Sequence, residues 1–136
     1  MKIVVVSGGF DPVHVGHIRY FRAAKQLGDE LVVILNSDKF LMKKKGFVFM
    51  PFNERKEILE AFACVDRVIP CLDKDQTVCK TLEELRPDIF ANGGDRFLEN
   101  IPEVDVCRRL GIEMIFNVGG KKIQSSSDLA AKLAGR

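Results

Sequence analysis

The sequence predicts an α/β fold, with a single doubly wound, mostly parallel sheet of five strands and helices on both of its faces. Apolar β-branched runs at Lys2–Ser7 and Leu31–Leu35 are continuous, which is typical of strands buried on both faces. Apolar residues at helical spacing separate these runs, and polar or glycine-rich loops follow them. With 136 residues, 46% of them hydrophobic, the chain is expected to form one domain over residues 1–136.

The first three elements are expected to form a strand–helix–strand unit. The segment His17–Leu27 follows the first strand and carries apolar residues at helical spacing: Ile18, Phe21, Ala24 and Leu27. Gly28 comes just past the last of them, where a glycine commonly ends a helix. The second strand should then be parallel to the first, with a right-handed crossover between them.

The rest of the chain continues the alternation of helices and strands. Asn53 is expected to cap a helix that carries Ile58, Leu59 and Phe62. The remaining predicted elements are a strand over Asp66–Pro70, a helix over Gln76–Leu85, a strand over Asp88–Ala91, a helix over Pro102–Leu110, a strand over Ile112–Val118 and a helix over Ser126–Leu133.

Composition argues against two classes of partner. The 21 Lys and Arg against 19 Asp and Glu leave a formal net charge of +2, so a nucleic-acid binder that works by bulk charge is not expected. No apolar run approaches the roughly 18–20 residues that a bilayer crossing requires, so no membrane span is expected. Because Met1-Lys2 leads straight into an apolar run without a leader-like pattern, we expect a soluble, cytoplasmic protein.

Polar and glycine-rich loops follow four of the predicted strands. In a parallel sheet these loops meet at the carboxyl edge, where open α/β folds bind their ligands. The loops are Ser7–Asp11, Asn36–Asp38, Asn92–Asp95 and Gly119–Lys121.

The strongest local signal is the segment Gly9–His17, between the first strand and the first helix. His14 and His17 are the only histidines of the chain, and on a first helical turn their spacing points both imidazoles to one side. Gly16 between them would let a ligand approach the backbone closely. Because exposed amides at a helix start favour anions, the motif indicates a phosphate site.

A purely structural role for the histidines, or a metal site, carries less weight. A capping or packing role would have to apply to both of them in one phosphate-suited loop. A zinc site needs a third ligand, and the cysteines, which we expect to be reduced, lie far away without metal or redox spacing: Cys64, Cys71, Cys79 and Cys107. The loop also lacks the glycine pattern of a dinucleotide site and the Gly-Lys-Ser/Thr of a P-loop. No metal site is therefore predicted.

Together these motifs resemble the cytidylyltransferase-like nucleotidyltransferases, whose hallmark is His-x-Gly-His after the first strand. The segments that carry the resemblance, in chain order, are Ser7–Asp11, His14–His17, Gln26–Leu31, Asn36–Asp38, Asn53–Lys56, Gly93–Asp95 and Ile123–Ser127. The resemblance implies a Rossmann-like fold and transfer of a nucleoside monophosphate from a nucleoside triphosphate, carried with Mg²⁺, to a small phosphorylated acceptor, with release of pyrophosphate. No enzyme nucleophile is needed, since positioning and charge neutralisation suffice.

The resemblance also implies roles for individual residues. His14 and His17 would hold the triphosphate and stabilise the transition state, and both must donate hydrogen bonds, as protonated or suitably tautomerised imidazoles. Lys45, with Lys44 as the alternative, would bind phosphate from a mobile loop after the second strand, unless this lysine cluster is a solvated face. Arg55 would contact an anion, which also suits its place in a first helical turn, where cations are disfavoured. The remaining predicted nucleotide-binding residues are Gly8, Gly9, Phe10, Gly16, Gly93, Asp95, Arg96, Ser125, Ser126 and Ser127.

Several of these residues also suit a second role. One of the three serines is needed as a helix N-cap and the others are left to offer hydroxyls to the β or γ phosphate, with capping alone as the alternative. Asp11 is expected to hold the loop, with a magnesium contact as its second possible role. CTP is slightly favoured over ATP, although Gly93-Gly94-Asp95-Arg96 is more similar to relatives that act on sugar phosphates with ATP.

The acceptor and the assembly are less sharply predicted. A flavin or pantetheine phosphate is a weaker candidate for the acceptor than a small sugar or polyol phosphate. A nucleotide-binding module without turnover is the competing function from a different class, and the intact pair of His14 and His17 argues against it. The apolar segment Phe47–Phe52 favours a homodimer.

Overall fold

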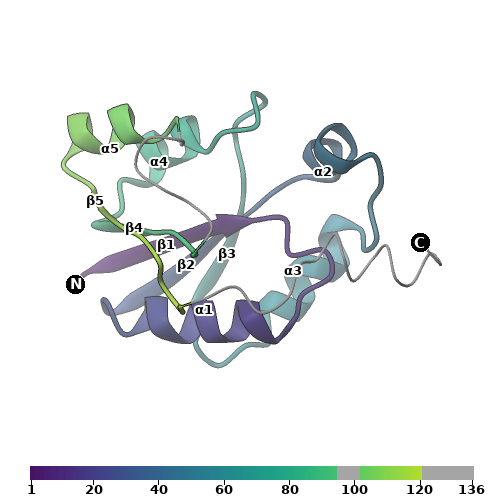
Figure 1. The fold of residues 1–136 in the computed structure, drawn as a ribbon, viewed down its shortest axis with the longest axis horizontal. Coiled ribbons are helices and arrows are strands. Elements are labelled where there is room, and N and C mark those ends of the chain that lie inside the picture. Colours follow the sequence, from purple (N-terminus) through teal and green to yellow (C-terminus); the bar gives the residue numbers. More distant parts are fainter. Residues whose placement is uncertain (95–101, 121–136) are drawn as a thin grey trace.

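A single parallel sheet organises the computed structural model, which describes residues 1–94 and 102–120. Within these residues the sheet has five strands in the order β3-β2-β1-β4-β5, and every neighbouring pair is parallel (Figure 1). The chain winds outward from β1 in both directions, so the strand order reverses between β1 and β4. The strands are β1 (Ile3–Gly8), β2 (Glu30–Leu35), β3 (Arg67–Pro70), β4 (Ile89–Ala91) and β5 (Glu113–Ile115).

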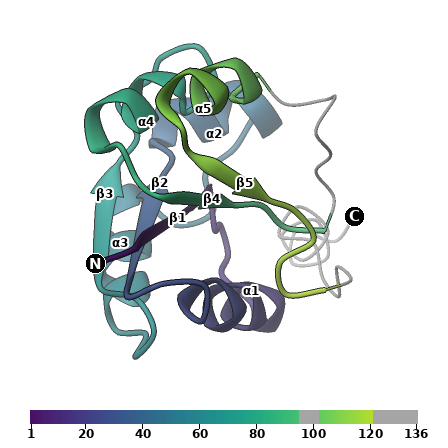
Figure 2. The same ribbon diagram turned by 90° about the vertical axis from the view of Figure 1, so that its left-hand side faces the viewer.

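Helices cover both faces of the sheet, as the sequence predicts. On one face α1 and α3 pack on Val4 and Val6, and on the other α4 and α5 pack on Val5 (Figures 1 and 2). Val4, Val5 and Val6 are fully buried, because both faces of β1 are covered. The described helices are α1 (Val15–Lys25), α2 (Asp38–Lys45), α3 (Phe52–Glu60), α4 (Cys79–Leu85) and α5 (Val104–Leu110). The Rossmann-like α/β fold is therefore confirmed. In the described part of the chain, none of the helices has the length and apolarity to cross a membrane.

Aspartate side chains close the amino edge of the sheet. Their carboxylates accept hydrogen bonds from main-chain amides at the start of β1 and β2, which would otherwise lack partners. Lys25, at the end of α1, donates to Asp66 across 2.5 Å. The carboxylate–amide pairs are Asp29 with Lys2, Asp88 with Ile3 and Asp66 with Leu31. These bonds at the amino edge thus stabilise the sheet, whereas the opposite edge carries the loops that are predicted to bind ligands.

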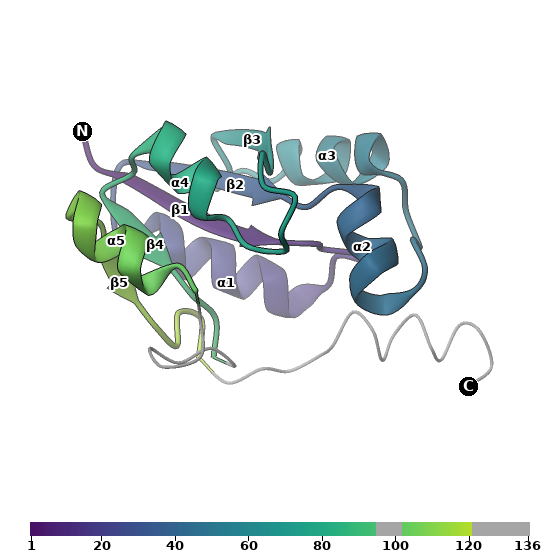
Figure 3. The ribbon, with the colours of Figure 1, turned by 90° about the horizontal axis from the view of Figure 1, so that it is seen from above.

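The α2 helix corrects the prediction of a mobile loop over the lysine cluster. The Ser37 side chain accepts from the amide of Phe40 at 3.0 Å and caps the helix start. Gly46 ends the helix in the left-handed conformation, with φ +83°. Figure 3 shows α2 beyond the carboxyl ends of β1 and β2, beside α3. The lysines therefore belong to a last helical turn, where positive charge is favourable.

Other boundaries also differ from the predicted ones. Pro51, rather than Asn53, precedes the first residue of α3. The α4 helix begins at Cys79 instead of Gln76, because the Asp73 carboxylate accepts from main-chain amides in its first turn. The β5 strand is shorter than the predicted Ile112–Val118. The predicted helix Ser126–Leu133 lies outside the described residues.

Candidate active site

The junction between β1 and α1 holds both histidines in defined orientations. His14 is the N-cap of α1, and its Nδ1 accepts from the amide of Gly16 at 3.1 Å. The amide of His14 in turn donates to Nδ1 of His17 at 3.2 Å. A main-chain amide can only donate, so each Nδ1 acts as an acceptor. In the neutral imidazoles the proton is then on Nε2, which makes each Nε2 a hydrogen-bond donor.

The two imidazoles lie against each other, as their spacing predicts. Their ring centroids are 3.8 Å apart and the ring planes differ by 24°. Phe10 meets the His17 ring edge to face at a centroid distance of 4.8 Å, so His17 lies between an imidazole and a phenyl ring. With these contacts and its Nδ1 bond, His17 has little freedom to turn. The structure thus presents two stacked imidazoles, each of which accepts a main-chain hydrogen bond at Nδ1.

The position of the His14 ring requires a glycine at residue 16. A Cβ at this position would lie 2.9 Å from Cε1 of His14 and 3.0 Å from its Nδ1. The predicted reason, space for a ligand beside the backbone, is therefore wrong, because the imidazole of His14 occupies that space.

The glycines before the motif are also packed against protein side chains. A Cβ on Gly8 would lie 2.8 Å from Cζ of Phe10, and a Cβ on Gly9 would lie 2.6 Å from Cδ2 of Leu41. Phe10 is buried in the core with a positive φ of 50°. These residues were predicted to bind nucleotide. In the structure they set the path of the loop that leads into the histidines.

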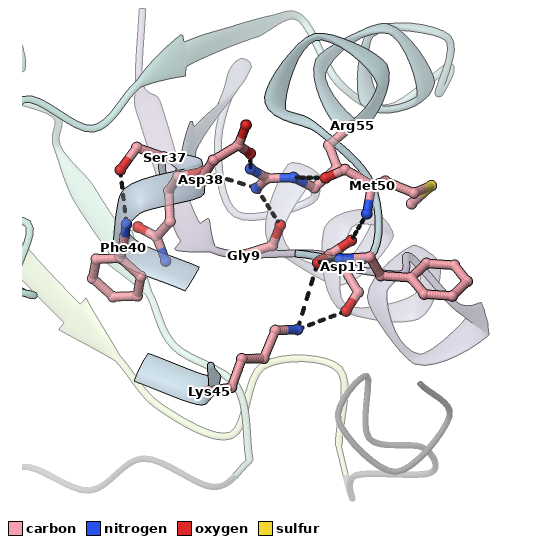
Figure 4. Close-up of polar contacts among 10 residues, drawn as sticks. Gly9, Asp11, Ser37, Asp38, Phe40, Lys45, Met50 and Arg55 are labelled. Carbon is pink, nitrogen blue, oxygen red and sulfur yellow. Dashed lines mark hydrogen bonds and ion pairs between the residues drawn. The ribbon is translucent and has the colours of Figure 1, made fainter. Parts of the chain in front are cut away.

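Arg55 differs most from its prediction. Its guanidinium was expected to contact an anion, but the residue is 1% exposed and the guanidinium donates to protein groups (Figure 4). Four of its five N–H groups are used, by the three carbonyls of Gly9, Asn36 and Met50 at 2.8–2.9 Å and by the Asp38 carboxylate at 2.7 Å. Arg55 thereby ties the loops after β1 and β2 to the segment before α3.

Asp11 holds the same loops from the other side. Its fully buried carboxylate accepts from the amides of Phe49 and Met50 at 2.7 and 2.6 Å. Both carboxylate oxygens thus bind main-chain amides, which matches the predicted loop-holding role.

Lys45 lies beside Asp11 and is largely buried. Its Nζ donates to the main-chain oxygen of Asp11 at 2.8 Å and is 3.7 Å from the carboxylate (Figure 4). Burial lowers the pKa of Lys45, and the neighbouring Asp11 carboxylate opposes this shift. Lys44 is exposed, with Nζ 5.8 Å from the centroid of the Phe40 ring. The geometry therefore separates the two lysines: Lys45 is close to the histidine loop, whereas Lys44 faces outward.

The loops after β4 and β5 pair with each other beyond the ends of the strands. The amide of Asn92 donates to the carbonyl of Ile115 at 2.7 Å, and the amide of Val118 donates to the carbonyl of Asn92 at 2.9 Å. A Cβ on Gly94 would lie 2.7 Å from the carbonyl oxygen of Gly120. Because β4 neighbours β1, these loops and the histidine loop share the carboxyl edge. Gly93 lies half-buried in this pair of loops. Asp95, Arg96 and Ser125–Ser127 lie outside the described residues.

Comparison with known proteins identifies the family. The sequence profile described as Cytidylyltransferase-like matches residues 5–126, which include most of β1, the other four described strands, both histidines and Arg55. The chain belongs to the cytidylyltransferase-like family. This family is the one that the His-x-Gly-His motif resembles.

Individual proteins of different names are similar to most of this chain. The bifunctional protein HldE of Citrifermentans bemidjiense is 39% identical over 124 residues, or 88% of this chain. The chain spans 25% of the length of that HldE. The FAD synthase of Ferroglobus placidus is 37% identical over 113 residues, covering 83% of this chain and 72% of the synthase. A solved structure, the lipopolysaccharide core biosynthesis protein of Thermoplasma volcanium, superimposes with a TM-score of 0.75 and 28% identity, covering 91% of this chain and 99% of that chain.

Sequence reasoning missed two residues at this edge. Asp38, in the first turn of α2, pairs with Arg55, and the sequence marked it only as part of the polar segment Asn36–Asp38, without a role of its own. Tyr20, the single tyrosine of the chain, donates its hydroxyl to the carbonyl of Ala91 at the end of β4. Its place three residues after His17 was the available signal, since residues at that spacing share a helix face.

Proposed function

We propose that this nucleotidyltransferase moves AMP from ATP to a small phosphorylated acceptor, with a sugar phosphate as the favoured class. An acceptor phosphate oxygen attacks the α-phosphorus of ATP, the bond from that phosphorus to the bridging oxygen breaks, and pyrophosphate leaves. The observation that carries the proposal is the pair of imidazoles whose Nδ1 atoms accept hydrogen bonds from main-chain amides. Their Nε2–H groups are then held in place to donate hydrogen bonds to the phosphate oxygens, on which negative charge grows in the transition state.

Similarity to named relatives supports ATP over CTP, which the sequence slightly favoured. The adenylyltransferase domains of HldE proteins match most of this chain, and FAD contains an adenylyl group joined through a diphosphate. Flavin mononucleotide is therefore the second acceptor candidate, favoured by the identity with the Ferroglobus FAD synthase. The two candidates share one chemistry, in which a phosphate monoester attacks ATP.

We assign to Lys45 the role of neutralising negative charge on the triphosphate or on the acceptor phosphate. Its side chain is 14% exposed beside the histidine loop, and its Nζ has donors beyond the one given to Asp11. Gly93, Asp95, Arg96 and Ser125–Ser127 keep their predicted nucleotide-binding roles as part of this proposal, whereas Lys44, which is exposed, is assigned none. Mg²⁺ would enter with the nucleotide, as part of the substrate.

The test measures pyrophosphate release with ATP, CTP, GTP and UTP against a panel of sugar phosphates, polyol phosphates and flavin mononucleotide. We expect release with ATP and at least one acceptor. If nucleotides raise the melting temperature of the protein but no pair releases pyrophosphate, the proposed reaction is wrong. Release with CTP alone would overturn the choice of base.

Two variants of His17 separate its role in holding the structure from its role in the reaction. In His17→Asn the carboxamide oxygen can replace Nδ1 as acceptor, but nothing reaches the Nε2 position. In His17→Gln the carboxamide nitrogen can reach the Nε2 position as a donor, but the Nδ1 acceptor is lost. We expect His17→Asn to melt near the wild type and to lose about 10²–10³-fold in kcat, the typical cost of one transition-state donor. Full activity in His17→Asn would remove the imidazole from the mechanism.

We also propose that the enzyme is a homodimer that buries the segment Phe47–Phe52. Phe49 is 44% exposed in the described chain, although its neighbours Phe47 and Phe52 are half-buried. An exposed apolar segment of this kind favours association. Sedimentation velocity at micromolar concentration tests it, with Phe49→Ser as the variant expected to shift the protein to monomer. A wild-type monomer would rule the dimer out.

A further inference from the structure

Tyr20 connects the helix of the histidine pair to the opposite side of the site. It lies on α1 one turn after His17, and its hydroxyl donates to the carbonyl of Ala91, the last residue of β4. Ala91 is fully buried, and the next residue, Asn92, begins the paired loops after β4 and β5. The hydrogen bond therefore fixes the end of β4 relative to the helix that carries His17.

A second contact joins the same helix position to the loop after β5. Gly119 has φ +86°, and a Cβ there would lie 2.8 Å from Cα of Tyr20 and 3.1 Å from its main-chain nitrogen. The turn after β5 thus packs backbone to backbone on α1 (Figures 1 and 2). Gly120 then packs on Gly94, where an added Cβ would lie 2.7 Å from the Gly120 carbonyl oxygen. Contacts run without interruption from Tyr20 through both loops.

We propose that Tyr20 is a positioning residue for nucleotidyl transfer, because it sets the spacing between the histidine pair and the loops after β4 and β5. This inference rests on the proposed function, in which the histidines hold the triphosphate and Gly93 also binds the nucleotide. One nucleotide then spans both sides of the Tyr20 contact. Attack at the α-phosphorus needs the reacting atoms aligned closely, and a misplacement of about 1 Å can cost about 10²-fold in rate.

The test compares Tyr20→Phe with a matched variant on the same helix. Tyr20→Phe keeps the ring and removes only the hydroxyl. Lys25→Met, at the other end of α1, removes the bonds of Lys25 to Asp66 and to the carbonyl of Asp29, away from the site. We expect Tyr20→Phe to lower kcat/KM for the nucleotide by about 10-fold, with the KM of the acceptor within about twofold of wild type. Lys25→Met should leave both values unchanged.

Hydrogen exchange supplies a readout that does not depend on activity. The amides of Asn92 and Val118 close the paired loops and should exchange faster in Tyr20→Phe but not in Lys25→Met. Gly119→Ala, which disturbs the same contact from the loop side, should speed exchange at the same amides. Unchanged exchange at both amides in Tyr20→Phe overturns the proposal, and so does a kinetic loss shared equally with Lys25→Met. If the wild type releases no pyrophosphate, the proposed function fails, and the exchange data still decide the positioning role.

Discussion

Replacement of Arg55 by methionine is expected to destabilise the protein strongly. Methionine keeps a long apolar stem but removes every N–H of the guanidinium, so the carbonyls of Gly9, Asn36 and Met50 lose their donor. Leaving a buried acceptor without a partner costs about 1–3 kcal/mol. Asp38, whose side chain is 46% exposed, regains water and adds little.

The expected loss is about 3–5 kcal/mol in the free energy of unfolding. This loss lies in the lower part of the range expected for three unpaired carbonyls. The reason is that removal of the buried guanidinium charge also removes the cost of desolvating that charge. A loss of this size is a large part of the stability of a small domain, which is about 5–15 kcal/mol.

Urea denaturation followed by circular dichroism measures this loss, with Lys56→Met as the matched control on the same helix. Lys56 makes an exposed ion pair with Glu60 at 2.9 Å, a contact with a typical value of only about 0.3–0.5 kcal/mol. If the two variants unfold within about 1 kcal/mol of each other, the carbonyls find other donors and the reasoning about Arg55 is refuted.

Three further predictions concern stability and reactivity. Gly16→Ala should lower the melting temperature and the turnover together, since its methyl group would displace the His14 ring and break the helix cap, at a cost of about 1–2 kcal/mol. The hydrogen bond from Lys25 holds the pKa of Asp66 below its ordinary value of 3.8, so its stabilisation is present above that pH and is lost as the pH falls through the folded pKa. The urea midpoint of the wild type should therefore exceed that of Asp66→Asn at pH 7, and the gap should shrink at pH 3. Burial raises the pKa of Cys107 to about 11, so iodoacetamide at pH 7.5 should modify this thiol only after the protein unfolds, as mass spectrometry of the peptides can show.

How far the sequence predicts this molecule depends on how local each signal is. The strand β1 and the histidine spacing are local patterns, and both were predicted. The α2 helix was missed although Ser37 and Gly46 mark its ends, because Leu41 is its only buried residue among the described ones and a run of lysines conceals the helical period. A weak apolar stripe gives a weak helix signal.

The interpretation of Arg55 failed for a different reason. Its partners Gly9 and Asn36 lie 46 and 19 residues away and offer main-chain carbonyls, which no residue pattern encodes. The same holds for Tyr20, whose partner lies 71 residues away. A first-turn arginine near a phosphate motif suggested an anion contact, and only the packed loops show that four of its five N–H groups are already in use.

The separation of α2 from the sheet bears on how far the sequence of this helix can change. The helix stands beyond the strands, buries little of its own surface and is tied down at its two ends, by Asp38 to Arg55 and by Lys45 to Asp11 (Figures 3 and 4). Exposed positions between these ties, such as Met42 and Lys43, can change without opening the core. The exposed surface of α2 can therefore diverge in sequence while the buried contacts of Arg55 and Asp11 continue to hold the loops after β1 and β2.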